Sequence, residues 1–380
     1  MTTPLRSHLQ NAFPRPSSLA PVFMDDLQKL RARIDQIDEQ LEDLISERAR
    51  VAEAVARAKQ ESGDDTYYRA EREAQVLRKV MARNPGPLSD EEMARLFREI
   101  MSACLALEQV MTIAFLGPEG TFTQAAALKH FGHSVQTTPL ATIGDVFREV
   151  ESGAASYGVV PVENSSEGVV NHTLDEFMQS SLKICGEVTL RIHHHLLSRS
   201  PSLDDVQKVY AHQQALAQCR KWLDTHLPRV ELVDVSSNAE AARRAAEEPH
   251  TAAIASEAAA DIYGLDILQR NIEDEPDNTT RFLVIGRRET PPSGVDKTSL
   301  LIYTDNRPGA LYSILEPIAR NGISMSRIES RPSRQGMWNY VFFIDIEGHV
   351  EDEKVARALQ ELEQTANIVK VLGSYPCAVL

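Results

Sequence analysis

Apolar residues between positions 27 and 58 recur in alternating steps of three and four. The series is Leu27, Leu30, Ile34, Ile37, Leu41, Leu44, Val51, Val55 and Ala58. Such spacing places these side chains along one side of an α-helix, as in the seam of a coiled coil. At a rise of about 1.5 Å per residue, a helix of about 35 residues is about 50 Å long. The pattern therefore predicts a long helix with an apolar seam.

Arg48 occupies the step of this series that lacks an apolar residue. A charge in an apolar seam costs several kcal/mol unless it is paired, so we expect Arg48 to meet a carboxylate, either of a ligand or of Glu73 or Glu108. Lys59 faces the same side of the helix. Arg31 lies about 25 Å from Arg48 along the axis. One small ligand can therefore contact both arginines only if a second copy of the helix supplies Arg31.

Two shorter helices are expected after the long one, from about residue 69 to 81 and from residue 89 onward. Ser89 and Glu92 form a capping box that begins the second of these. On that helix, Cys104 and Glu108 share a face at a spacing of four.

Residues 111 to 290 alternate short apolar runs with helical segments, which favours α/β structure. A glycine-rich turn and the hydroxyl of Thr121 follow the apolar run 112–116, and this arrangement can bind an anion at a helix start. The pattern recurs at 157–162, which precedes Glu163, Asn164 and Ser165. Further strands are predicted at 183–192, 206–210, 230–233 and 251–254. We expect two α/β lobes with a ligand cleft between them.

The stretch Asn278-Thr279-Thr280-Arg281-Phe282 leads directly into the apolar run 283–286. It brings two hydroxyls and a guanidinium to the mouth of a buried strand, a usual place for site residues in α/β folds. This placement favours chemistry on an anion. The alternative is a polar strand start whose hydroxyls satisfy the loop backbone.

The residues that follow a linker at 291–294 show a different order of elements. Strands are predicted at 299–304, 323–330, 340–346 and 368–372, with helices at 310–320 and from residue 351. This βαββαβ order is ferredoxin-like.

Composition and charge limit the classes of partner that the chain is expected to bind. Its 380 residues suggest two or three domains, and no apolar run is long enough to span a bilayer. A net charge of -15 argues against nucleic acid or an anionic membrane as a partner. Neither GxGxxG nor a GK[ST] ending is present, so no nucleotide cofactor is expected.

The cysteines and histidines give no sign of a metal site. Cys104, Cys185, Cys219 and Cys377 are far apart in sequence, which favours reduced thiols and a cytoplasmic protein. The run 193–195 is all histidine, but no carboxylate or cysteine stands nearby at ligand spacing, so we expect strand residues rather than a metal centre.

The first 23 residues contain four prolines and no apolar stretch, so a secretory signal is not expected. A disordered tail is the expectation, with an organelle transit peptide as the alternative.

The segments LRARIDQIDEQLEDLISERARVAEAVARAK, YRAEREAQVL and LFREIMSACLALEQ resemble the all-helical chorismate mutases. The resemblance implies rearrangement of chorismate to prephenate in a dimer, with preorganised cations stabilising the polar transition state. The residues that it implies are the partner's Arg31, together with Arg48, Lys59, Arg72, Glu73, Cys104 and Glu108.

Two of these positions depart from the commonest pattern. Cys104 stands where a serine is frequent, and Glu108 stands where a glutamine often donates to the ether oxygen of the substrate. A carboxylate can donate only when protonated. Burial would raise the pKa of Glu108, whereas Arg48 and Lys59 would lower it. If Glu108 acts as the donor, the mutase should work better in acid.

The segments GPEGTFTQAA, PVENSSEG, YAHQQALAQC and NIEDEPDNTTRF resemble prephenate dehydratase, with Gln213 replacing a common proline. The resemblance implies two lobes similar to periplasmic binding proteins, and loss of hydroxide and carbon dioxide from prephenate to give phenylpyruvate. The implied site consists of Thr121, Glu163, Asn164, Ser165, Gln214, Thr280 and Arg281. Thr280 is assigned as the donor to the departing oxygen, and Glu163 as a candidate proton source.

PGAL at 308–311 and ESRP at 329–332 resemble the ACT regulatory domain, in which phenylalanine binds at a dimer interface. The implied effector residues are Gly309, Ala310, Leu311, Glu329, Ser330, Arg331 and Pro332. Tyr312 departs from the usual valine. A purely structural dimerisation domain is the alternative.

The expected organisation is a tail at 1–23, a chorismate mutase domain at 24–110, a prephenate dehydratase domain at 111–290 and an ACT domain at 297–376. Together the resemblances imply a bifunctional, phenylalanine-inhibited homodimer or higher homo-oligomer that acts on chorismate and prephenate without cofactor or metal. The alternatives are an arogenate-preferring dehydratase and a non-catalytic amino-acid sensor.

Overall fold

The computed structural model describes residues 20–63, 66–332 and 340–380. Most of the expected N-terminal tail, residues 1–19, lies outside this range. The chain divides into two compact units, with the boundary after Val55.

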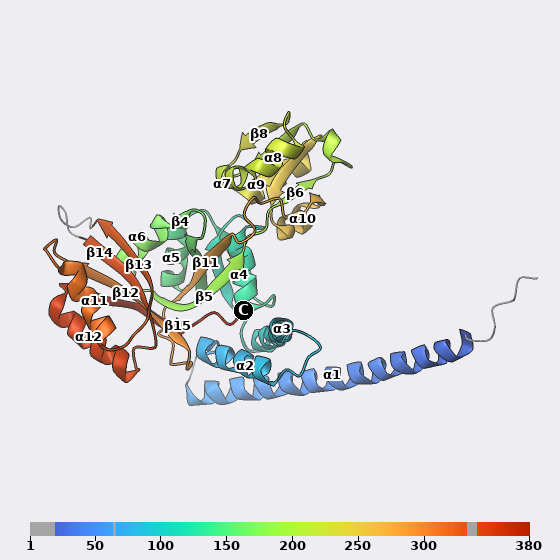
Figure 1. Cartoon of the computed structure of the whole chain (residues 1–380). Helices are drawn as coiled ribbons and strands as arrows, with labels where there is room; N and C mark the ends of the chain where they lie inside the picture. Colours follow the sequence, from blue (N-terminus) through green and yellow to red (C-terminus); the bar gives the residue numbers. More distant parts are fainter. Residues whose placement is uncertain (1–19, 64–65, 333–339) are drawn as a thin grey trace, which may run out of the picture. The chain divides into compact units, whose positions relative to one another are not determined.

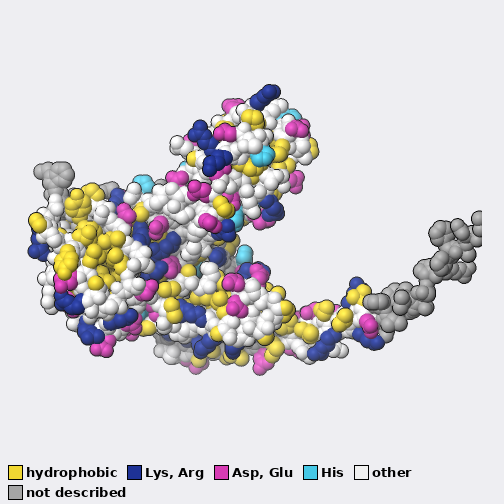
Figure 2. All heavy atoms as spheres, in the orientation of Figure 1, with side chains coloured by type: hydrophobic (Ala, Val, Ile, Leu, Met, Phe, Trp, Pro, Cys, Tyr) yellow, Lys and Arg dark blue, Asp and Glu magenta, His cyan; other side chains and the backbone are white. Residues whose placement is uncertain are grey.

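Helix α1 (Ala20–Ser62) is 43 residues long and forms the described part of the first unit before crossing the boundary (Figure 1). The predicted seam is uncovered in the chain. Its side chains from Leu27 to Val55 are between 39% and 64% exposed. Figure 2 shows apolar side chains following this helix. An apolar side of this length gains free energy only when another surface covers it.

The second unit begins with the end of α1 and two shorter helices, α2 (Ala70–Arg83) and α3 (Asp90–Glu108). The side chain of Ser89 accepts a hydrogen bond from the Glu92 backbone N–H at 3.1 Å, which confirms the predicted start of α3. Tyr68 and Ala70, at the start of α2, are buried in one cluster with Ile113. These two helices therefore share a core with the α/β region that follows.

The first α/β lobe contains a six-stranded sheet in the order β2-β1-β3-β11-β5, with β4 paired to β3. The strands are β1 (Thr112–Leu116), β2 (Gln136–Leu140), β3 (Tyr157–Asn164), β4 (Gly168–Val169), β5 (Lys183–Arg191) and β11 (Thr279–Gly286). The helices of this lobe are α4 (Phe122–Phe131), α5 (Ile143–Ser152) and α6 (Asn171–Gln179). Strand β11 runs antiparallel between β3 and β5. It therefore lies inside the sheet although it comes last in the sequence.

The second lobe contains a five-stranded sheet in the order β10-β6-β9-β7-β8. Its strands are β6 (His195–Ser198), β7 (Lys208–Ala211), β8 (Glu231–Asp234), β9 (Thr251–Ala255) and β10 (Asp266–Gln269). Its helical segments are η1 (Leu203–Asp205), α7 (Gln213–Gln218), α8 (Arg220–His226), α9 (Asn238–Glu247) and α10 (Glu257–Tyr263). The two-lobed α/β prediction is confirmed.

The C-terminal domain has the predicted βαββαβ order. Its elements are β12 (Asp296–Thr304), α11 (Ala310–Arg320), β13 (Met325–Pro332), β14 (Tyr340–Glu347), α12 (Glu353–Thr365) and β15 (Ile368–Pro376). The strand order is β13-β14-β12-β15. One face of this sheet packs on α11 and α12 through residues such as Ile302 and Ile314. The other face, including Leu301 and Phe343, joins the core of the first lobe.

Within the described ranges, no helix combines the length and the apolar character needed to span a bilayer.

Candidate functional site

The cationic residues predicted for the mutase site are divided between the two units. Arg31 and Arg48 lie on α1 within the first unit; Arg31 is exposed and Arg48 is half-buried. Lys59 belongs to the second unit, where its ammonium donates to the Thr66 carbonyl at 3.2 Å.

Glu108 lies at the end of α3 in a poorly solvated position. Its Oε2 atom is buried and has no hydrogen-bond partner among the described residues. Burial raises the pKa of Glu108, while the nearby charge of Lys59 lowers it, and the net direction is upward. The sequence did not show which effect on the pKa is larger. In the folded chain the effect of burial exceeds that of Lys59. A protonated Glu108 can donate a hydrogen bond, as the mutase chemistry would require.

Arg72 and Glu73 lie in different surroundings although they are adjacent. Arg72 is exposed. The carboxylate of Glu73 pairs with the Nε atom of Arg98 on α3 at 3.2 Å. Arg98 also donates to the Lys129 carbonyl at 2.8 Å, which connects α3 to α4. The resemblance implied Glu73 as a site residue, and the structure gives it an internal ion-pair partner that the sequence did not identify.

Thr280 and Asn164 meet where strands β11 and β3 adjoin. The two residues are partners in the strand register. The side-chain N–H of Asn164 donates to Thr280 Oγ1 at 2.8 Å and to Asn278 Oδ1 at 2.9 Å. We call this place, where Thr280 and Asn164 meet, the Thr280 corner. Ser165 also belongs to it, because its Oγ accepts from the Thr279 backbone N–H at 3.0 Å. A hydroxyl that accepts from Asn164 can still donate its own proton.

Polar contacts continue from this corner toward the second lobe. Asn278 donates to Gln218 Oε1 at 3.2 Å, and His194 Nε2 lies 2.8 Å from the same oxygen. Burial lowers the pKa of His194, so the ring is neutral near pH 7. Asn278, Gln218 and His194 were not predicted as site residues. Asn278 and Gln218 lie within the segments NIEDEPDNTTRF and YAHQQALAQC. Their polar side chains inside these segments were the signal that could have identified them.

A carboxylate distant in sequence contacts the histidine run 193–195. Glu273 lies 2.8 Å from His193 Nδ1 and accepts from the His194 backbone N–H at 2.9 Å. Within the described part of the chain, no cluster of His, Cys, Asp and Glu has the arrangement of a metal site.

Thr121 and Gln214 do not join the Thr280 corner through any contact among the described residues. Thr121 caps α4: its Oγ1 accepts from the Gln124 N–H at 3.4 Å and donates to the Leu116 carbonyl at 3.1 Å. Gln214 is exposed on α7. The turn before Thr121 is held from the second lobe, because Ser256 Oγ donates to the Gly120 carbonyl at 2.9 Å.

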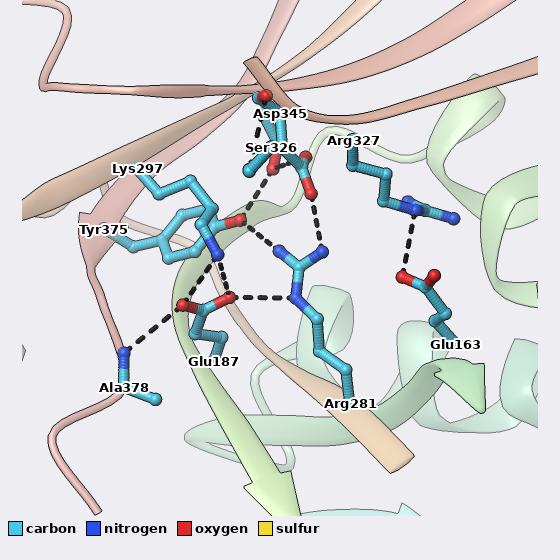
Figure 3. Close-up of polar contacts among 10 residues, drawn as sticks. Glu163, Glu187, Arg281, Lys297, Ser326, Arg327, Asp345, Tyr375 and Ala378 are labelled. Atoms are coloured by element: carbon cyan, nitrogen blue, oxygen red, sulfur yellow. Dashed lines mark hydrogen bonds and ion pairs between the residues drawn. The ribbon is translucent and has the colours of Figure 1, made fainter. Parts of the chain in front are cut away.

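Arg281 points to the face of β11 opposite Thr280, because successive strand side chains alternate. Its Nε donates to Glu187 at 2.8 Å, and its Nη1 donates to Asp345 of the C-terminal domain at 2.6 Å (Figure 3). Its Nη2 donates to the Tyr375 hydroxyl at 3.0 Å. Burial lowers the pKa of Arg281, but these three partners outweigh it and hold the pKa above its ordinary value. The resemblance implied that Arg281 and Thr280 belong to one site. In the structure their side chains point to opposite faces of β11.

Glu163 shares the face of Arg281, since the two residues are register partners on β3 and β11. Its Oε2 lies 3.3 Å from Nε of Arg327 on β13. The alternation of side chains thus separates Thr280 and Asn164 from Arg281 and Glu163. This placement does not support Glu163 as the proton source beside Thr280.

The effector residues expected in the C-terminal domain fall on two sides of β13. Gly309, Ala310, Leu311 and Ser330 line one pocket, together with Tyr312. Arg331 points elsewhere: its Nη1 donates to the Asn171 carbonyl at 2.6 Å and lies 3.0 Å from Asp175. Glu329 alternates with Ser330 and shares the side of Arg331.

These parts define a multidomain enzyme with a C-terminal sensor-like domain, and comparison with known proteins agrees. The chain matches the family models chorismate mutase type II over residues 30–109, prephenate dehydratase over 113–290 and ACT domain over 298–364.

Two relatives cover nearly the whole chain. A bifunctional chorismate mutase/prephenate dehydratase of Stutzerimonas stutzeri is 58% identical and spans 94% of this chain and 99% of its own length. One of Aquifex aeolicus is 49% identical with the same coverage of both chains. The chain therefore belongs to the bifunctional chorismate mutase/prephenate dehydratase family. Neither the arogenate alternative nor the non-catalytic sensor is favoured by these matches.

A solved structure resembles a large part of the chain. The prephenate dehydratase from Arthrobacter aurescens, in complex with L-Phe, is 38% identical with a TM-score of 0.65. The match covers 70% of this chain and 89% of that chain.

Proposed function

We propose that the chain rearranges chorismate to prephenate and then converts prephenate to phenylpyruvate, under feedback inhibition by phenylalanine. The observation that carries the dehydratase assignment is the hydrogen bond from Asn164 to Thr280 at the adjoining ends of β3 and β11. It orients a hydroxyl whose proton remains available for a leaving group.

In the dehydratase step, the bond between the ring and its carboxylate breaks and carbon dioxide leaves. The electron pair of that bond enters the ring, and the C–O bond of the ring hydroxyl breaks as the ring becomes aromatic. The departing hydroxide needs a proton or a strong donor. Thr280 is assigned this role, and a positioned donor contributes about 10² to 10⁴ in rate.

In the mutase step, one C–O bond breaks and one C–C bond forms within chorismate, so no nucleophile is needed. Arg48, Lys59 and the partner's Arg31 are assigned to the two carboxylates of the substrate. A protonated Glu108 is assigned as donor to the ether oxygen. Its buried oxygen and upward-shifted pKa support this role.

Phenylalanine is assigned to the pocket between the start of α11 and β13. Gly309, Ala310, Leu311 and Ser330 lie together there, as the effector motifs require. The L-Phe complex of the Arthrobacter aurescens dehydratase supports this ligand. Apolar side chains gather on the visible surface of this domain in Figure 2, and Leu311 and Tyr312 are 42% and 68% exposed.

A cytoplasmic homodimer is the proposed assembly. The exposed seam of α1 supplies a surface that a second copy of the same helix would cover, and it would bring in the partner's Arg31.

The proposal is tested by adding chorismate to the purified chain and following prephenate and phenylpyruvate together, with and without phenylalanine. We expect prephenate to form first, phenylpyruvate to follow, and phenylalanine to suppress the second step. Accumulation of prephenate without phenylpyruvate would remove the dehydratase assignment. Formation of phenylpyruvate at equal rates in millimolar phenylalanine would remove the regulatory one.

A further inference from the structure

Strand β13 presents different chemistry on its two faces. Arg327, Glu329 and Arg331 alternate with the more exposed Ile328 and Ser330. Ser330 lines the pocket assigned to phenylalanine. Both arginines contact the dehydratase domain instead. One short strand therefore touches the effector pocket with one face and the catalytic domain with the other.

Arg327 approaches the dehydratase corner directly. Its side chain is only 10% exposed, and its Nε lies 3.3 Å from Glu163 Oε2. Figure 3 shows the two side chains pointing toward each other. Its Nε and Nη2 are buried without a hydrogen-bond partner in the described part of the chain. A guanidinium with buried N–H groups that lack hydrogen bonds is sensitive to small displacements, because little compensates for the lost hydration of those groups. Glu163 immediately precedes Asn164, which holds Thr280.

Arg331 contacts residues that follow Glu163 by about eight to twelve positions in the sequence. It donates to the carbonyl of Asn171, the first residue of α6, and pairs with Asp175 one turn further on. The two arginines thus hold the segment 163–171 at both ends, and this segment contains Asn164 and Ser165.

The neighbouring strand β14 adds a contact to β11. Asp345 is the register partner of Arg327 and accepts from Arg281 at 2.6 Å. Arg281 is the residue after Thr280. Both strands that supply the Thr280–Asn164 pair are therefore held from the C-terminal sheet.

We propose that β13 couples the effector pocket to the dehydratase site, with Arg327 and Arg331 as positioning residues. They hold segment 163–171 where Asn164 supports Thr280. Phenylalanine that contacts Ser330 favours a position of β13 in which the Arg327–Glu163 contact is lost and the hydroxyl of Thr280 is no longer oriented. Such coupling needs only that phenylalanine binds the two positions of the strand with different affinity. This inference rests on the proposed function.

The test compares Arg327→Met, Arg327→Lys and Arg331→Met with a control, Arg320→Met. Arg320 is 60% exposed and pairs with Glu316 on α11, in the same domain. Four quantities are measured on the full chain: kcat and KM for prephenate, inhibition by phenylalanine, the Kd of phenylalanine by calorimetry, and mutase activity.

For Arg327→Met we expect kcat to fall about tenfold to a hundredfold because the hydroxyl is misplaced, with KM changed by less than about threefold. The remaining activity should be at least about fivefold less sensitive to phenylalanine, although phenylalanine still binds. Arg327→Lys should recover part of both properties, and Arg331→Met should show the same pattern more weakly. Arg320→Met should match the unmodified chain.

Unchanged kcat and unchanged inhibition in Arg327→Met would overturn the inference. So would a loss of kcat with full inhibition of the remaining activity, since that pattern describes a merely structural residue. Phenylalanine binding and mutase activity show whether the variants are folded, and if Arg327→Met fails this check, Arg331→Met decides by the same criteria. An unmodified chain that ignores phenylalanine would instead contradict the proposed regulation, so the two failures are distinguishable.

Discussion

At the scale of single residues, the two proposed sites use uncharged donors in different ways. Thr280 accepts a hydrogen bond from the Asn164 amide, whereas burial raises the pKa of Glu108. Each donor makes a prediction that can be checked in the intact chain.

The first prediction concerns acid dependence of the mutase. Glu108 has an upward-shifted pKa, and its protonated form is the proposed donor. The mutase rate should therefore be highest below that pKa and fall as pH rises through it, while Glu108→Gln should flatten the profile. The measurement is kcat/KM for chorismate from about pH 5 to about pH 8. A flat profile in the unmodified chain would exclude this role for Glu108.

The second prediction concerns Thr280. Thr280→Ala removes the proposed donor and should lower dehydratase kcat by about 10² to 10⁴, with mutase activity intact. Thr279→Ala is the matched control, because that neighbouring hydroxyl donates to the Asp277 carbonyl at 3.1 Å instead. Steady-state assays with prephenate and with chorismate separate the two activities. Equal losses in both variants would mean that the strand start, and not the Thr280 hydroxyl, matters.

At the scale of elements, β11 is one of the strands through which the dehydratase domain contacts the C-terminal domain. Arg281 lies between Glu187 and Asp345, and Glu187 is also bound by Lys297 at 2.8 Å. The cluster is buried, so its charges are not screened as surface pairs are.

The third prediction follows from this cluster. Arg281→Met leaves Asp345 without its cationic partner and should lower the free energy of local opening of β11 by about 3 kcal/mol. Hydrogen exchange of the backbone amides from 281 to 285 measures that opening. Arg270→Met is the control, because Arg270 pairs with Glu257 where both side chains are 58% exposed. Equal exchange in the two variants would show that the cluster does not stabilise the strand.

Element prediction succeeded where periodicity was strong and failed where strands were short. Helix α11 was predicted with its observed bounds, and the cap of α3 was found from Ser89. Strands β2 and β10 were missed, and of β6 only His195 was expected to be a strand residue. They are four or five residues long, and β2 reads QTTPL with no residue fully buried. Such strands are specified by pairing with neighbours and not by their own apolar pattern.

At the scale of the whole molecule, the two proposed sites differ in what a single chain supplies. The long helix α1 leaves its apolar seam exposed in the single chain. The mutase half of the proposal therefore depends on a second copy, whereas the proposed dehydratase corner is built within one chain.

The fourth prediction tests this difference. Leu41→Glu introduces a charge into the seam, and the cost of burying it should prevent the helices from pairing. Mutase activity should fall at least about a hundredfold, because the partner's Arg31 no longer completes the site. Gln40→Glu adds the same charge outside the seam series and serves as the control. Sedimentation measures assembly, and a dimeric Leu41→Glu variant with full mutase activity would contradict the proposed site.

The sequence by itself determined the order of elements in the C-terminal domain, the seam of α1 and the motifs that identify the family. These features depend on helical and strand periodicity and on residues close together in the chain, so local physical chemistry is enough to read them. It also singled out Thr280 and Asn164, which the structure joins by a hydrogen bond.

Only the tertiary structure decided which side chains meet. The Glu73–Arg98 pair, the unpartnered oxygen of Glu108 and the contact of Arg327 with Glu163 join residues far apart in sequence. Adjacent strand residues point to opposite faces, so Thr280 and Arg281 acquire different partners that depend on which strands lie beside β11. Register and long-range packing set those neighbours, and a linear pattern does not contain them.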